Sequence, residues 1–87
     1  MKETMVLINP RKGDGHGVCD ARVPLRELAP GLRLTLPVNG TGHNDPPVSH
    51  RCVVRHVHYA HRWIRVEYKM GGQTLSECFK FTEEGER

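Results

Sequence analysis

Residues 63–81 read WIRVEYKMGGQTLSECFKF, and this stretch decides the fold. Apolar and polar side chains alternate on both sides of the two glycines, a pattern typical of two half-buried strands joined by a tight turn. Pairing Lys69 with Thr74 across the glycines gives one nearly apolar face and one nearly polar face. The stretch therefore predicts an antiparallel hairpin with strands at Trp63–Met70 and Thr74–Phe81.

Two further strands are expected before this hairpin, at Leu32–Val38 and Arg51–Tyr59. The first alternates as LRLTLPV, and Pro37 marks its end or an edge. The register of the second is set by Arg55, because burying arginine costs more than burying histidine or cysteine. We therefore expect the register that keeps Arg55 outside and turns the even-numbered residues inward: Cys52, Val54, His56 and His58.

The expected core is the inward face of all four strands. Its apolar members are Leu34, Leu36, Val54, Ile64, Val66, Tyr68, Leu75 and Phe79. The hairpin register also turns Glu77 toward this face, next to Val66. Carboxylates are rarely buried without a partner, so we favour a solvated glutamate at the rim over a buried one paired with His56.

The chain is short enough for one domain over residues 1–87. Residues 1–30 read irregularly: MVLIN can form a short strand, the glycine-rich RKGDGHG a surface loop, and VPLRELA one or two helical turns. Residues 31–81 hold the strands. Residues 82–87, TEEGER, form an acidic tail.

A strand after Pro-Gly, the long loop NGTGHNDPPVSH and a three-strand antiparallel meander resemble an SH3-like small barrel, over roughly residues 28–81. The segment CVVRHVHYAHRWIRVEY…LSECFKF is also similar to short uncharacterised proteins of gut bacteria and their mobile elements. These resemblances imply a mainly all-β domain and supply no catalytic residue. SH3-like barrels bind peptides, nucleic acids or other proteins, so the fold narrows function only by analogy.

The composition bears on the cellular location of the protein and on the state of its cysteines. No apolar run approaches the ~20 residues that span a bilayer, and the apolar patch in MKETMVLINPRKG is too short for a signal-peptide core. We expect a cytoplasmic protein with no membrane partner. Three cysteines, at positions 19, 52 and 78, make an odd number, so free thiols are expected rather than disulfides. No motif indicates a cofactor.

The best functional signal is a basic surface. The net charge of +3 is mild, but from Arg51 to Lys69 there are five basic residues and one acid, Glu67. In the expected register the outer face carries a set of cations and aromatic residues: Arg51, Arg55, Tyr59, Trp63, Arg65 and Lys69. Such a set suits nucleic acid or an acidic protein surface. The alternative to a binding surface is an ordinary solvent-exposed sheet face with no binding role.

Two other function classes remain open. His56 and His58 share a face in the expected register, and with Cys52 they are candidate zinc ligands, although no paired metal-binding framework accompanies them. A thiol enzyme needs a cleft, a base and an oxyanion site, which a domain of this length rarely builds. We therefore expect a non-enzymatic interaction module, with a small metal-binding protein as the alternative.

Overall fold

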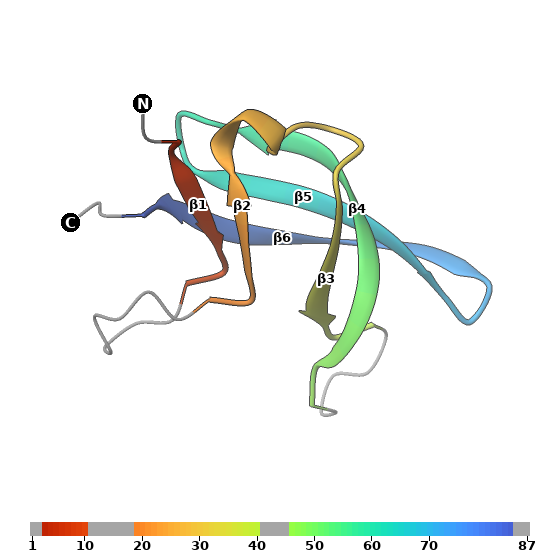
Figure 1. Ribbon diagram of the computed structural model, residues 1–87. Coiled ribbons are helices and arrows are strands. Elements are labelled where there is room, and N and C mark those ends of the chain that lie inside the picture. Colours follow the sequence, from red (N-terminus) through yellow and green to blue (C-terminus); the bar gives the residue numbers. More distant parts are fainter. Residues whose placement is uncertain (1–2, 11–18, 41–45, 85–87) are drawn as a thin grey trace.

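The computed structural model describes residues 3–10, 19–40 and 46–84. It shows an all-β fold of antiparallel strands in the order β2-β1-β6-β5-β4-β3 (Figure 1). The strands are β1 (Met5–Ile8), β2 (Ala21–Pro24), β3 (Arg33–Val38), β4 (Val48–His58), β5 (Trp63–Met70) and β6 (Gln73–Glu83). The sheet curls until its end strands β2 and β3 come into contact, which gives a small, nearly closed barrel. The expected fold class is confirmed.

The β5–β6 hairpin has the predicted register. Lys69 lies opposite Thr74 and Ile64 lies opposite Phe79. The connecting residues Gly71 and Gly72 have φ angles of 59° and 78°. Positive φ at both central residues is the geometry of a type I′ turn, whose twist matches that of the two strands. The two glycines therefore fix the alignment on which the polar and apolar faces depend.

The N-terminal segment contains the short strand expected at MVLIN, which is β1, and a second strand, β2, that was not predicted. β1 pairs with both β2 and β6, so this segment completes the barrel. β6 continues to Glu83 and takes up the start of the predicted acidic tail. Strands of four residues, such as β1 and β2, are too short to show a clear alternation. The predicted helical turn is a 3-10 turn, η1, at Leu25–Glu27.

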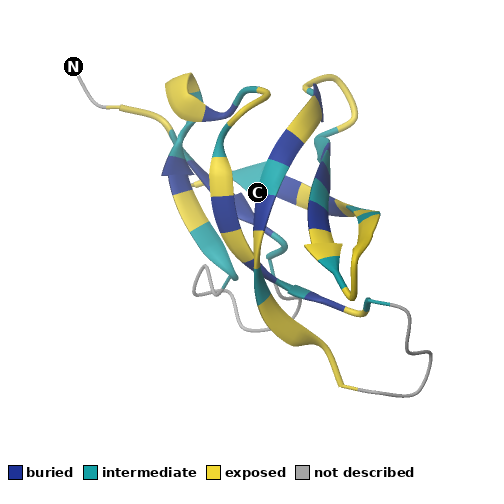
Figure 2. Cartoon of the chain, turned by 90° about the vertical axis from the view of Figure 1, so that its right-hand side faces the viewer, coloured by how far each residue is buried: buried dark blue, intermediate teal, exposed yellow. Residues whose placement is uncertain are grey.

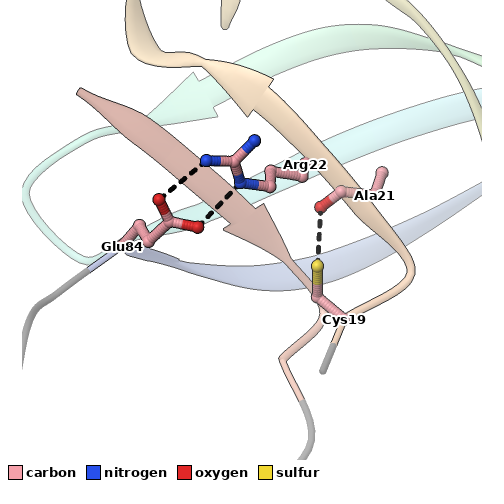
Figure 3. Close-up of polar contacts among 4 residues, drawn as sticks. All are labelled: Cys19, Ala21, Arg22 and Glu84. Atoms are coloured by element: carbon pink, nitrogen blue, oxygen red, sulfur yellow. Dashed lines mark hydrogen bonds and ion pairs between the residues drawn. The ribbon is translucent and has the colours of Figure 1, made fainter. Parts of the chain in front are cut away.

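Arg22 of β2 forms a bidentate ion pair with Glu84, the residue that follows β6 (Figure 3). The Arg22 Nε donates to Oε2 of Glu84 at 2.7 Å, and the Arg22 Nη2 donates to Oε1 at 2.8 Å. This hydrogen bonding lowers the pKa of the Glu84 carboxyl below its ordinary value. The predicted RKGDGHG loop, the TGHND part of the long loop and the last three residues lie outside the described residues. Within the described part, no helix is long and apolar enough to cross a membrane.

The buried residues, dark blue in Figure 2, are all apolar within the described part of the chain. Seven of the eight expected core residues are buried, and Leu75 is half-buried and packs against them. Cys52 is also buried, as its expected inward orientation requires. The other core members were not predicted, and several come from the N-terminal segment: Val6, Leu7, Ile8, Val23, Leu28, Val38, Val57 and Phe81.

β4 carries a β-bulge that the sequence analysis did not foresee. Val54 lies opposite Val66, but the next paired residue is His56, opposite Arg65. Arg55 is the extra residue, and it reverses the alternation. Val57 therefore faces the core, whereas His56 and His58 face outward. The prediction that both histidines point inward is wrong, because the bulge buries both valines and still leaves Arg55 exposed.

Candidate functional site

The outer surface of β3–β6 gathers six basic side chains. Cross-strand partners share a face, so the registers of the three hairpins place these side chains on one side of the sheet. We call this set the basic face: Arg33, Arg51, Arg55, Arg65, Lys69 and Lys80. Glu67 is the one acidic residue of β3–β6 on that side, since Glu77 and Glu83 lie opposite buried Val66 and Val6.

Glu67 lies between two members of the basic face. Arg55 Nε donates to its Oε1 at 3.0 Å, and Arg65 lies 3.5 Å from its Oε2. Exposed ion pairs of this kind contribute roughly 0–1 kcal/mol each to stability. The other four cations, Arg33, Arg51, Lys69 and Lys80, have no acidic partner among the described residues. Their charges are available to an anionic ligand.

An aromatic cluster adjoins the basic face. The ring of His58 stacks on Trp63 with centroids 5.1 Å apart and planes 21° apart, and His56 lies 5.4 Å from the same indole. His61 extends the cluster, 4.6 Å from His58. The bulge at Arg55 creates this grouping. If residues 54–58 formed an uninterrupted strand with Val54 facing inward, both strand histidines would face the core. The signal in the sequence was the pair Val54 and Val57, which cannot both face inward on a regular strand.

Tyr59 has a structural contact. It is 55% exposed, but its hydroxyl donates to the backbone carbonyl of Leu28 at 2.5 Å. That bond fastens the β4–β5 turn to the segment that leads into β3. Of the predicted binding residues, the structure places Arg51, Arg55, Trp63, Arg65 and Lys69 on the outer face. Tyr59 reaches away from them toward Leu28.

Arg33 and Lys80 were missing from the predicted set. Both were visible in the sequence, since the alternation of LRLTLPV turns Arg33 outward and the hairpin register sets Lys80 opposite Trp63. Both lie outside residues 51–69, where basic residues are concentrated in the sequence. Their addition widens the basic face to all four strands of the meander.

The three predicted zinc ligands do not lie on the same face of the sheet. Cys52 is 2% exposed and belongs to the core, whereas His56 and His58 lie on the opposite side of the sheet. Burial raises the pKa of the Cys52 thiol above its ordinary value, which disfavours the thiolate that a metal needs. Within residues 3–10, 19–40 and 46–84, no three histidine, cysteine or acidic side chains are grouped so that they could hold a metal ion.

Glu77 keeps part of its surface exposed and is not paired with His56. It is half-buried on the inner face, where its Oε2 accepts hydrogen bonds from the Tyr68 hydroxyl at 2.5 Å and the Asn39 backbone N–H at 2.9 Å. Gly40 in turn donates its N–H to the Tyr68 hydroxyl oxygen at 3.1 Å. This cluster holds together the β3 end of the long loop and the β5–β6 hairpin.

Comparisons of the chain with protein-family models, with curated proteins and with solved structures found no match.

Proposed function

We propose that the chain is a non-enzymatic binding module whose basic face binds nucleic acid. Small β-barrels of the SH3-like kind, which the strand pattern resembles, use their outer surfaces and loops for such binding. The observation that carries the proposal is the charge of the basic face: six cationic side chains on one side of four adjacent strands, against one carboxylate.

Nucleic acid fits this face better than a protein does because of what accompanies the charge. Cations alone suit any anionic surface. Here the cations flank an indole and two imidazoles, and nucleic acids present phosphates beside flat bases that stack on such rings. An acidic protein surface offers carboxylates without the flat rings.

The proposal is tested by measuring the affinity for a labelled oligonucleotide at several salt concentrations. Affinity is expected to fall steeply with salt, because each neutralised phosphate releases condensed counterion. Arg51→Glu together with Lys69→Glu is expected to weaken binding more than tenfold and to flatten the salt slope by about one unit per lost contact. Both residues are exposed, so folding is expected to be unaffected.

The matched control is Arg22→Glu together with Arg26→Glu. It makes the same change in net charge at exposed positions outside β3–β6. Equal losses in both double variants would show that net charge alone drives binding, and would overturn the proposal. An acidic peptide that binds more tightly than an oligonucleotide of equal charge would replace nucleic acid with a protein partner.

A further inference from the structure

A hollow of about 370 Å³ opens on the outer surface, between the start of β5 and the middle of β6. It is lined by Trp63, Cys78, Phe79 and Lys80. Small-molecule sites are typically about 300–1,000 Å³, so the hollow is the size of a site for one small ligand group. Its lining is mainly apolar, with the Lys80 ammonium as its one charge.

Trp63 lines this hollow and also contacts two histidines, His56 and His58. His58 stacks on it from the β4 side, whereas Lys80, its partner on β6, lies on the side of the hollow. The stacked imidazole holds the indole in place, so a ligand entering the hollow meets an ordered ring. A preorganised ring loses little conformational freedom on binding.

Two cations lie at or next to the hollow. Lys80 forms part of its wall, and Arg65 lies directly opposite Cys78 in the β5–β6 register. A flat apolar group that enters the hollow therefore brings its neighbouring atoms within reach of these cations. The ligand that matches this arrangement has a flat ring linked to an anionic chain.

We propose that the hollow is a base-stacking subsite and that the chain binds single-stranded nucleic acid. This inference rests on the proposed function and names its substrate class. In a duplex both faces of a base are covered by its neighbours, whereas an unpaired base can turn out and stack on an aromatic side chain. In this arrangement one base lies against Trp63, and the phosphates on either side meet Lys80 and Arg65.

The experiment compares a labelled single-stranded thymidine oligonucleotide with an abasic strand of equal length, which keeps the phosphates and lacks the bases. The intact strand is expected to bind roughly tenfold more tightly, because stacking of one base on an aromatic ring is worth about that factor. Trp63→Leu is expected to remove this difference and leave the affinity for the abasic strand unchanged. Trp63→Phe, which keeps a flat ring, is expected to restore part of it.

Two measurements on the unaltered protein guard against a variant that fails to fold. Trp63 is the only tryptophan, so its fluorescence is expected to be quenched by the intact strand and not by the abasic one. The exposed thiol of Cys78 is expected to be protected from alkylation by the intact strand alone.

The outcomes separate the two proposals. Failure of both strands to bind overturns the proposed function and this inference together. Equal affinity for the intact and abasic strands, or tighter binding of a duplex than of the single strand, overturns the inference and leaves the proposed function standing. Quenching of Trp63 by an acidic peptide in preference to the oligonucleotide would also overturn it.

Discussion

The hydroxyl of Tyr68 donates a hydrogen bond of 2.5 Å to Oε2 of Glu77, across the β5–β6 hairpin. The tyrosine is buried, and the carboxylate would lack a side-chain partner without it. The hydroxyl also accepts the Gly40 N–H at 3.1 Å. One side chain thus joins two backbone segments that are far apart in the sequence.

Tyr68→Phe is expected to lower the free energy of unfolding by about 1–3 kcal/mol, because the half-buried Glu77 carboxylate loses one of its two hydrogen bonds and the Gly40 N–H loses its acceptor. The measurement is denaturant unfolding. Tyr59→Phe is the matched control: it also removes one hydroxyl, but from an exposed ring. A smaller loss for Tyr68→Phe than for Tyr59→Phe would contradict the structural role of this hydrogen bond.

The same pair predicts a loss of stability at high pH. Burial, and then the hydrogen bond and negative charge of Glu77, raise the pKa of Tyr68 above its ordinary value of about 10. Above pH ~10 the unfolded chain loses the phenol proton while the folded chain keeps it, so stability falls as the pH rises toward the folded pKa. The stability gap between the parent and Tyr68→Phe is therefore expected to shrink above pH 10. A gap that is constant from pH 8 to about 11 would show that the pKa is not raised.

Glu67→Gln is expected to tighten oligonucleotide binding. Removing this carboxylate frees Arg55 and Arg65 from their ion pairs and raises the net charge of the basic face by one unit. The salt dependence of affinity should steepen, because more phosphates are neutralised. Stability should change by no more than about 1 kcal/mol. Glu84→Gln is the control, since it releases Arg22 outside the basic face. Equal tightening in both variants would show that the location of the charge has no effect.

The three thiols are expected to differ in reactivity. All are free in the structure, with Cys78 exposed, Cys19 half-buried and Cys52 buried. The raised pKa of Cys52 further suppresses its reactive thiolate. A thiol reagent should modify Cys78 first and Cys52 last in the native protein, and should find three groups in the denatured, unreduced protein. Finding one group after denaturation would reveal a disulfide.

Much of the meander could be predicted because alternation fixes a regular hairpin. The strand Trp63–Met70 has its predicted ends, and the register through Gly71 and Gly72 follows from pairing one apolar face. The same reasoning identified most of the basic face. The apolar run MVLIN indicated the short strand that is β1, but not its pairing with β6, and β2 was not predicted, because four-residue strands show their pairing only when a partner is in place.

The histidines were misplaced for a different reason. Comparing two uninterrupted registers of Arg51–Tyr59 forces a choice between burying Arg55 and burying His56. The bulge removes that conflict by adding one unpaired residue, so residues up to Val54 follow one register and residues from His56 follow the other. The grouping of Trp63 with the histidines therefore depends on a local irregularity.

This interpretation predicts that deleting Arg55 leaves the fold intact. Without that residue the chain reads Val54-His56-Val57-His58, which alternates regularly with both valines inward. The pairs Val54–Val66 and Val57–Ile64 are expected to be retained. The loss of the ion pair with Glu67 should cost no more than about 1 kcal/mol. Circular dichroism, amide NMR and the emission of Trp63 are expected to stay close to those of the parent.

Deletion of Val53 is the matched control, because it removes one residue from the regular part of the same strand. Every residue before it then changes face, so Arg51 enters the core position of Cys52 while Cys52 moves outward. Burying an unpaired arginine is strongly unfavourable, and this variant is expected to unfold. If the Val53 deletion folded and the Arg55 deletion did not, β4 would be regular, and His56 and His58 would face the core instead of flanking Trp63.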